Sequence, residues 1–333
     1  MSTPPVSVVL PFRDAAATLG AALDSLRSQT LADFECLLVD DGSRDASPAL
    51  AAACAAADPR FRVIEAGGGL VDALNRGIAA ARAPLVARMD ADDLAHRERL
   101  ARQCERLARD ASLSAVGCLV ECFPVDAAGA GMRRYVEWLN GVVSCEAIRD
   151  AIFVESPIAH PSAVLRRTAL DAVGGYRHGD GPEDYDLWLR LVLDGHRLAK
   201  VPEMLLSWRD SPGRLSRVDR RYERRRFLAT KLAHFPRAVP PTTRLQIWGA
   251  GPTGRAWARG LRQHGYTIGC FIDIAPQRWG RRLAGVPVEQ PRAPDRRDGF
   301  VLIAVGTPGA RAWIEAWLAQ HDLRPWRDYL AVA

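Results

Sequence analysis

The chain has 333 residues, of which 48% are hydrophobic and 25% charged, and it carries a formal net charge of +6. This is the composition of a globular protein with room for two domains, and it excludes a largely disordered chain. The apolar runs are shorter than the roughly 18 residues that a membrane-spanning helix needs, and the first residues lack a basic segment and a cleavage site, so we expect a cytoplasmic protein. The seven cysteines lack the spacing of a zinc site, and we expect them to be reduced thiols. No nucleic-acid partner is expected.

The first ninety residues predict strands that alternate with helices. Such alternation, with helices of about 10 to 15 residues, implies a parallel, doubly wound α/β sheet with right-handed crossovers. Ligands bind beyond the carboxyl ends of the strands in sheets of this kind. The expected strands are 6–12, 34–39, 61–65 and the run that begins at Leu85, and the expected helices are 15–29, 48–57 and 70–81.

Three aspartates follow the strand that begins at Leu85, in the stretch LVARMDADD: Asp90, Asp92 and Asp93. Carboxylates one residue apart at a strand end can both bind one hard cation, and Mg²⁺ or Mn²⁺ held in this way keeps positions open for substrate phosphates. The first hypothesis is therefore a metal that bridges to a diphosphate. The alternative is that these acids form a solvated turn or cap a helix over 94–107.

A second acidic strand end supports the metal hypothesis. Asp40 and Asp41 follow the strand 34–39, and one of them could accept a hydrogen bond from the imide N–H of uracil or from a ribose hydroxyl. If Asp90 and Asp92 then hold ribose and metal, a nucleoside diphosphate site extends across the sheet.

Transfer of a sugar from such a donor needs a base for the acceptor hydroxyl. The best candidate is the pair Glu183 and Asp184 in GPEDYDLWLRL, although helix capping alone could explain two acids at a helix start. Around this pair the sequence predicts strands at 114–123, 162–166 and 199–209, helices at 144–153 and 183–193, and a less regular segment at 126–140.

Basic residues are concentrated between Arg217 and Arg226, on a helix expected over 216–235 with a partial apolar stripe. Such a face can contact an anionic membrane or a phosphate-bearing acceptor, and the alternative is a solvated helix packed on the domain below. Pro236, Pro240 and Pro241 are expected to break the chain and to form a linker.

Beyond the prolines the α/β pattern begins again. The strand 245–248 leads directly into a GxGxxG turn formed by Gly249, Gly251 and Gly254, and the strand 267–272 ends in Asp273, where a ribose hydroxyl would be bound. This predicts a small Rossmann-like domain with a site for NAD(P) or another nucleotide. The alternative is a packing or dimerisation module with an empty turn.

Six segments occur in a fixed order: VSVVLPFRDAAATLGAALDSLRSQT, LLVDDGSRD, GLVDALNRGIAAARAPLVARMDADD, HPSAVLRR, GGYR and EDYDLWLRL. Together they resemble the family 2 glycosyltransferases, which have the glycosyltransferase A fold. The resemblance covers about residues 5–216. It implies metal-dependent, inverting transfer from a nucleoside diphosphate sugar, most often a UDP-sugar.

The resemblance also implies roles for individual residues. Asp184, paired with Glu183, matches the general base, and Asp92 is the favoured metal ligand of the Asp-x-Asp motif that begins at Asp90. Pro11 and Arg13 lie on the first loop over the nucleotide, Asp40 and Asp41 contact its base, and His160, Trp188 and Arg209 are candidates for the acceptor side. His160 and Trp188 could instead be core residues.

Two departures from the family pattern refine these expectations. Relatives often carry a histidine where this chain has Ser211, which puts a diphosphate or metal contact from that position in doubt. Processive members carry Gln-x-x-Arg-Trp, whereas Gln277, Arg278 and Trp279 are misspaced and lie in the C-terminal segment, so single-sugar addition is expected. That segment resembles small Rossmann-like domains attached to sugar-modifying enzymes, some of which bind nucleotides.

The sequence thus predicts a catalytic domain over 1–215, a basic helix and linker over 216–241, and an accessory domain over 242–333. The expected activity is transfer of one sugar to a saccharide or lipid-linked acceptor in cell-surface glycan biosynthesis, by a protein that is cytoplasmic or peripheral to the inner face of the membrane. The alternatives are an NAD(P)-dependent sugar-nucleotide oxidoreductase that acts through the C-terminal domain, and a non-catalytic protein that binds nucleotide sugars.

Overall fold

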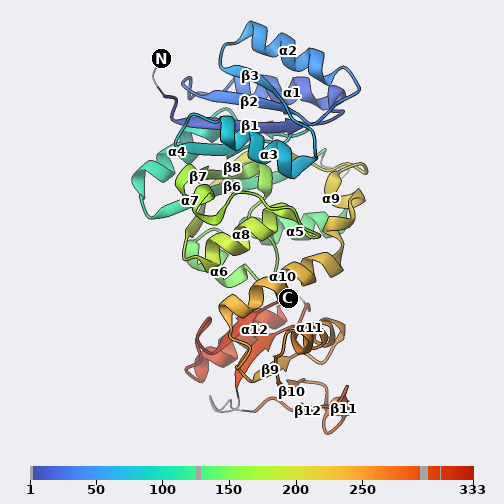
Figure 1. Ribbon diagram of the computed structural model, residues 1–333. Helices are drawn as coiled ribbons and strands as arrows, with labels where there is room; N and C mark the ends of the chain where they lie inside the picture. The colour runs from blue at the N-terminus through green and yellow to red at the C-terminus, as the bar shows by residue number, and fades with distance from the viewer. Residues whose placement is uncertain (1–2, 125–128, 293–298, 308) are drawn as a thin grey trace. The chain divides into compact units, whose positions relative to one another are not determined.

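The structure is a computed structural model that describes residues 3–124, 129–292, 299–307 and 309–333 (Figure 1). The chain forms two compact units, each built on its own sheet. Unit 1 comprises Met1–Ile148 and Pro157–Arg220, and unit 2 comprises Arg149–Ser156 and Arg221–Ala333. The short segment Arg149–Ser156 therefore belongs to unit 2, although it lies far from the rest of that unit in the sequence.

Unit 1 is organised around an eight-stranded sheet with the order β3-β2-β1-β4-β7-β6-β8-β5. The first four strands in this order are mutually parallel, as the alternating pattern predicts, and β7 runs antiparallel to both of its neighbours. The strands are β1 (Val6–Phe12), β2 (Glu35–Asp40), β3 (Phe61–Glu65), β4 (Leu85–Arg88), β5 (Leu94–Ala95), β6 (Leu113–Phe123), β7 (Val164–Arg166) and β8 (Arg197–Arg209).

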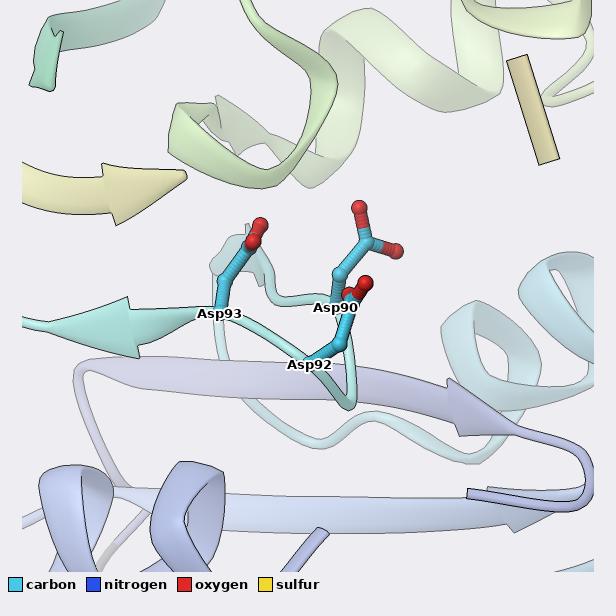
Figure 2. A group of neighbouring side chains, drawn as sticks. All are labelled: Asp90, Asp92 and Asp93. Atoms are coloured by element: carbon cyan, nitrogen blue, oxygen red, sulfur yellow. The ribbon is translucent and has the colours of Figure 1, made fainter. Parts of the chain in front are cut away.

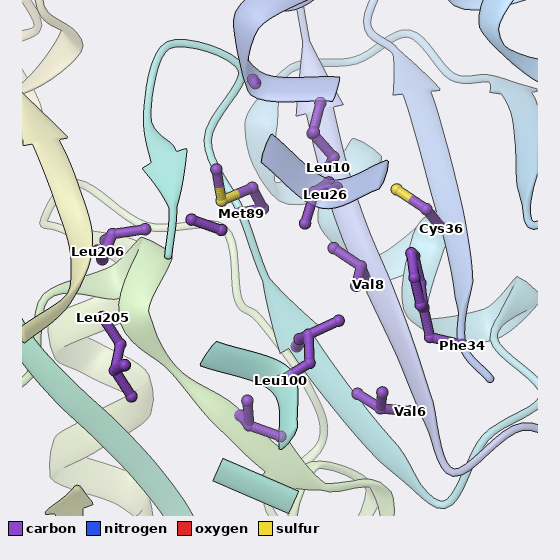
Figure 3. Packing of buried hydrophobic residues seen from close by; sticks show 14 of the residues in the cluster. Val6, Val8, Leu10, Leu26, Phe34, Cys36, Met89, Leu100, Leu205 and Leu206 are labelled. Atoms are coloured by element: carbon purple, nitrogen blue, oxygen red, sulfur yellow. The ribbon is translucent and has the colours of Figure 1, made fainter. Parts of the chain in front are cut away.

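The core of unit 1 follows from the two-residue period of its strands. Val6, Val8 and Leu10 of β1 belong to a buried cluster that includes Leu26 of α1 and Leu100 of α4 (Figure 3). The helices of unit 1 are α1 (Ala16–Arg27), α2 (Ser47–Ala57), α3 (Leu70–Ala80), α4 (Arg99–Arg109), α5 (Ala130–Gly141), α6 (Cys145–Ala151, which continues into unit 2), α7 (Arg167–Val173), α8 (Glu183–Leu193) and α9 (Leu215–Val218), with 3-10 turns at His160–Ser162 and Arg220–Tyr222.

Helix α3 packs on the sheet face that Val9 occupies. A Cβ atom on Gly77 of this helix would lie 2.5 Å from Cγ1 of Val9 and 3.1 Å from Cγ2 of Val39. Gly77 therefore permits close approach of the helix to β1 and β2. This approach places the loop before α3 beside the carboxyl end of β2, where the site described below is found.

Three expected elements differ in the structure. The helix expected from Leu94 begins only at Arg99, because Leu94 and Ala95 form β5 and pair with β8. The segment 126–140 is expected to be irregular, but most of it belongs to the helix α5. The apolar residues of α5 that pack on the core recur at helical spacing. Residues 126–128 lie outside the described residues. These apolar residues are Met132, Tyr135, Val136 and Leu139.

The basic segment is also different from the expectation of one helix over 216–235. It forms α9, a 3-10 turn and α10 (Arg224–Ala238), because Asp219 and Glu223 adopt extended conformations between them. Pro236 lies inside α10 and does not end it. The arginines therefore do not form one amphipathic face.

Unit 2 contains a six-stranded sheet with the order β11-β12-β10-β9-β13-β14, parallel except for the pair β11 and β12. Phe235 of α10 lies in its core, with ring centroids 5.6 Å from Phe153, 5.7 Å from Trp257 and 5.5 Å from Tyr266. Its elements are α10, β9 (Leu245–Trp248), α11 (Pro252–Gln263), β10 (Ile268–Ile272), β11 (Arg282–Leu283), β12 (Val286–Glu289), β13 (Phe300–Ile303), α12 (Ala310–Gln320) and β14 (Tyr329–Ala331), with a 3-10 turn at Pro276–Arg278.

The expected strands of unit 2 are present, and the structure adds β11, β12 and β14 to them. These three strands have two to four residues each, too short for a periodic pattern to be recognised in the sequence. Across both units, none of the helices that the structure describes is long and apolar enough to cross a membrane.

Candidate active site

The loop between β4 and β5 carries the three aspartates of the Asp-x-Asp-Asp motif. One carboxylate oxygen from each of Asp90, Asp92 and Asp93 lies within 4.8 Å of the others. Figure 2 shows the three side chains pointing the same way from this loop. Because α4 begins only at Arg99, these acids do not cap that helix, and the capping alternative is wrong.

Burial and mutual repulsion disfavour three negative charges in this loop. Burial, and then the charge of Asp90, raise the pKa of Asp92 to about 6. Burial, and then the charges of Asp90 and Asp92, raise the pKa of Asp93 well above its usual value. Asp93 is 1% exposed, and its Oδ2 has no hydrogen-bond partner among the described residues. The cluster therefore lacks positive charge at its centre.

A divalent cation would supply that charge. Oxygen atoms of several carboxylates are the ligands that Mg²⁺ and Mn²⁺ prefer, and the unpaired Oδ2 of Asp93 points to a missing ligand of this kind. The cluster thus fits a hard cation. Asp90 and Asp92 were predicted as ligands from the sequence, and the structure brings Asp93 to the same group.

Arginines surround the acidic loop. Arg88, at the end of β4, is 3% exposed and donates hydrogen bonds to the Asp90 carboxylate and to the carbonyl of Met89. Arg209 donates from Nε to the carbonyl of Asp92 over 2.7 Å, and its backbone N–H donates to Oδ1 of Asp93 over 2.8 Å. In the structure Arg209 therefore holds the acidic loop, and its contact with the acceptor stays a prediction.

A further arginine, Arg214, follows β8. Its guanidinium lies 3.9 Å from the ring centroid of Trp208, and its positive charge lowers the pKa values of Asp92 and Asp93 against the larger effect of burial. The planar guanidinium thus stacks on an aromatic ring close enough to the acids to act on them.

The carboxyl ends of β1 and β2 bring the predicted nucleotide contacts to the same edge of the sheet. Pro11, expected on the first loop, is instead a buried residue of β1, whereas Arg13 follows that strand and is exposed. Oδ1 of Asp40 accepts hydrogen bonds from the backbone and hydroxyl of Ser43 at 2.9 and 2.6 Å. Oδ1 of Asp41 accepts one from Gly69 N at 2.9 Å, which fixes the glycine loop before α3.

The candidate base pair begins α8. Glu183 is 2% exposed, whereas Asp184 is more accessible and accepts a hydrogen bond from Tyr185 N at 2.8 Å. Burial, and then the charge of Glu183, raise the pKa of Asp184 to about 8; the charge of Asp90 contributes in the same direction. The start of α8 and the acidic loop therefore act on each other electrostatically, and Asp184 has the proton affinity of a base that works near neutral pH.

The structure corrects Trp188 as a candidate for the acceptor side, whereas the role of His160 stays a prediction. Trp188 is completely buried, so its ring cannot contact an acceptor in this structure. His160 is 8% exposed, its Nε2 lies 2.6 Å from the hydroxyl of Tyr176, and its Nδ1 lies 3.9 Å from Oε1 of Glu183. Burial, and then the charge of Arg88, lower the pKa of His160 well below its usual value, so the ring is neutral.

The second predicted site lies in unit 2, where Gly249, Gly251 and Gly254 form the turn between β9 and α11. A Cβ atom on Gly254 would lie 1.8 Å from the carbonyl oxygen of Gly249, which explains the glycine at the helix start. Asp273, predicted to bind ribose, accepts hydrogen bonds from Ala250 N at 3.0 Å and from Nη1 of Arg278 at 2.7 Å. Its carboxylate thus fixes the glycine turn.

Sequence reasoning did not assign roles to Arg88, Arg214 or the buried carboxylate of Asp93. Arg88 is the one charge inside the apolar run LVARM, and a charge in a buried strand signals a nearby acid. Arg214 gave no comparable signal, because its neighbours in the structure, Trp208 and Asp92, are 6 and about 120 residues away in the chain.

Comparison with known proteins agrees with this geometry. Residues 7–174 match the family described as Glycosyl transferase family 2. The amylovoran biosynthesis glycosyltransferase AmsE of Erwinia amylovora is 32% identical over 193 residues, which cover 57% of this chain and 70% of AmsE. The UDP-Gal:alpha-D-GlcNAc-diphosphoundecaprenol beta-1,3-galactosyltransferase of Escherichia coli is 25% identical over 213 residues, 63% of this chain and 75% of that protein.

A solved structure with a similar fold is the mannosyltransferase PcManGT from Pyrobaculum calidifontis, in complex with GDP-Man and Mn²⁺. It superposes with a TM-score of 0.52 at 20% identity, over 80% of this chain and 70% of that one. At this level of identity the similarity shows the fold, and the predicted glycosyltransferase A fold is confirmed. From the family match over half of its length, the chain belongs to glycosyl transferase family 2.

Proposed function

We propose that this chain catalyses inverting, metal-dependent transfer of a single sugar from a nucleoside diphosphate sugar, with UDP-sugar as the favoured donor. The observation that carries the proposal is the convergence of Asp90, Asp92 and Asp93 within 4.8 Å at the carboxyl end of β4. Three carboxylates with too little positive charge among them suit a cation that must also bind a diphosphate.

The acidic loop would hold Mg²⁺ or Mn²⁺ through Asp90, Asp92 and Asp93. When bound, the cation supplies positive charge that stabilises the departing nucleoside diphosphate. Arg214, stacked on Trp208 beside this loop, adds a second positive charge on the same side. Asp40 and Asp41 lie two strands away at the same edge, where Oδ2 of each carboxylate can accept a hydrogen bond from the base or ribose.

Asp184 is proposed as the general base. With a pKa of about 8 it can take a proton from the acceptor hydroxyl as the bond to the sugar forms, and Glu183 behind it keeps its proton affinity high. The effect of the Asp90 charge on the pKa of Asp184 supports a common site for the base and the leaving group. Attack from the base side and departure on the metal side would invert the anomeric configuration.

The names of relatives support a donor and an acceptor class. The Escherichia coli relative is named as a transferase from UDP-Gal to a lipid diphosphate-linked sugar, and AmsE is named for biosynthesis of the polysaccharide amylovoran. We therefore propose a saccharide or lipid-linked acceptor in cell-surface glycan synthesis. Peripheral contact with an anionic membrane through Arg217–Arg226 stays a prediction, now without a single amphipathic helix to carry it.

The test is calorimetric titration of the full chain with UDP, GDP, ADP and their sugar conjugates, with Mn²⁺ and with EDTA, followed by transfer assays with the donor that binds. We expect Mn²⁺ to add binding of one nucleoside diphosphate, and Asp92→Asn to abolish this Mn²⁺-dependent binding. Asp24→Asn is the matched control, since Asp24 is 73% exposed on α1 and should leave binding unchanged.

Two outcomes would contradict the proposal. Absence of any Mn²⁺-dependent binding, or Mn²⁺-dependent binding that survives Asp92→Asn, would reduce the acidic loop to an architectural role. Metal-dependent binding without transfer to any saccharide or lipid-linked acceptor would instead favour a non-catalytic nucleotide-sugar binding protein.

A further inference from the structure

Unit 2 contains a cavity of about 660 Å³ that the proposed transfer reaction does not use. Its lining comes from the segments that follow the carboxyl ends of β9, β10 and β13, and from the start of α12. In the sheet order, β9 lies between β10 on one side and β13 on the other. The strands that follow β9 in the chain therefore lie on both of its sides. The crevice that forms where the strand order reverses in this way is where open α/β sheets bind ligands.

One wall of the cavity is the glycine turn. Gly249 has φ +117°, and a Cβ atom there would lie 2.7 Å from the carbonyl oxygen of Ala304, so only glycine fits. At Gly251, in contrast, a Cβ atom would meet nothing within 4 Å. Gly251 is the N-cap of α11 and provides no side chain to cap the helix. The cavity therefore has open space directly in front of a positively polarised helix end.

The opposite part of the cavity is apolar and exposed. Ile274, after β10, is 68% exposed, and Trp313, on α12, is 55% exposed; both line the cavity. The ring of Trp313 packs edge-to-face on Trp248, with centroids 6.5 Å apart, which leaves much of the indole accessible. An accessible aromatic face beside an exposed aliphatic side chain suits a planar ring.

The charged residues of the cavity select the ligand further. Asp273 accepts hydrogen bonds from Ala250 N, Ala275 N and Arg278, so both of its oxygens are occupied within the protein. Its negative charge is paired with Arg278, so it repels an anion less than a free carboxylate would. Arg278 remains 44% exposed at the cavity, and Thr253 and Thr307 add hydroxyl groups to its lining.

From these features we propose that the cavity of unit 2 binds a nucleoside phosphate without a metal ion. The phosphate lies at Gly251 and the start of α11, near Arg278, and the base lies between Ile274 and Trp313. This site is separate from the metal-dependent donor site of unit 1. The proposed site differs from a dinucleotide site in two ways. Asp273 does not bind ribose there, and the site holds one nucleotide.

The test uses the full chain with Asp90→Asn and Asp92→Asn, in EDTA, so that the donor site is silent. Calorimetry measures binding of ADP, GDP, UDP, CDP, inorganic phosphate and NAD⁺. We expect at least one nucleoside diphosphate to bind more tightly than phosphate or NAD⁺. Trp313→Ala should weaken that binding by about five- to hundredfold, the range for loss of a stacked aromatic ring.

Gly251→Asp is the decisive variant. Its backbone is extended, with φ −75° and ψ −172°, and aspartate is a favourable N-cap, so the fold should be kept. The new carboxylate would occupy the phosphate position, and we expect at least a tenfold loss of binding. Gly20→Asp on the exposed side of α1 is the matched control, with the same charge change and open space around it, and should bind as before.

Any of four results would overturn the proposal. These are no metal-independent binding of a nucleotide, binding that Gly251→Asp leaves intact, phosphate that binds as tightly as any nucleotide, or NAD⁺ as the tightest ligand. The last would revive the oxidoreductase alternative. Failure here is distinguishable from failure of the proposed transfer, because the latter is measured as Mn²⁺-dependent binding in the wild-type chain.

Discussion

The two units each place an aspartate just beyond the carboxyl end of a parallel strand, and the two environments have opposite consequences. In unit 1 the acids after β4 crowd together, and burial with mutual repulsion raises the pKa of Asp92 to about 6. In unit 2 burial alone would raise the pKa of Asp273, but hydrogen bonds from Ala275, Arg278 and Ala250 outweigh it and lower the pKa.

The position of an acid at a strand end therefore does not by itself identify a binding group. An acid can serve as a binding group where the protein does not already supply it with hydrogen-bond donors or a positive charge. Asp273 has them, and it fixes the glycine turn. Asp93 has an oxygen without any partner among the described residues, and a cation is the group that would complete it.

The largest expected effect is on the base of unit 1. Asp184→Asn removes the group that accepts the proton but keeps the size of the side chain, so kcat should fall by about 10²- to 10⁴-fold. Mn²⁺-dependent donor binding, measured by calorimetry, should change little. Asp171→Asn on α7, which is exposed, is the matched control and should keep full activity. Near wild-type turnover by Asp184→Asn would show that the base is elsewhere.

The pH dependence of transfer sharpens the same assignment. A base must be unprotonated to act, and the pKa of Asp184 is raised to about 8 by burial and by Glu183. We expect kcat/KM at saturating Mn²⁺ to rise about tenfold per pH unit and to level off at or below about pH 8, because a bound cation offsets the charge of Asp90.

Glu183→Gln provides the check on this profile. It removes the neighbouring negative charge, which lowers the pKa of Asp184, so the rising limb should move toward lower pH. A merely structural role of Glu183 would reduce the rate at every pH without moving the limb. An unmoved limb would therefore contradict the coupling of the two acids.

The sequence predicted the parts of this fold and site that depend on local pattern. The apolar runs predicted β1 to β4, and their parallel arrangement meant that Asp41 and Asp90 had to share one edge of the sheet. The features it missed depend on distant partners. Leu94 forms a strand because β8 is available to pair with it, and the burial of Trp188 is decided by how α8 packs in the fold.

In unit 2, replacement of Asp273 is expected to cost stability. Asp273→Asn removes the ion pair with Arg278 and weakens the hydrogen bond to the glycine turn, a loss of about 1–2 kcal/mol. A carboxyl group with a lowered pKa stabilises the fold above its unfolded pKa and loses this effect as pH falls through the folded value. The difference between variant and wild type in thermal denaturation should therefore shrink toward low pH. Loss of nucleotide binding without loss of stability would instead make Asp273 a ligand contact.

The smallest effect is expected for Asp92→Asn in unit 1, and its effect on stability has the opposite sign to that of Asp273→Asn. The pKa of Asp92 is raised in the folded protein, so its ionisation disfavours folding, and the metal-free protein loses stability as pH rises from about 4 to about 6. Asp92→Asn removes this penalty. Without metal at pH 7.5 the variant should be more stable than wild type by about 1 kcal/mol, since partial exposure screens the full effect. With Mn²⁺ the order should reverse, because only the wild type gains stability from the cation. A variant less stable than wild type in EDTA would show that the acids of unit 1, like Asp273, are already balanced by protein groups.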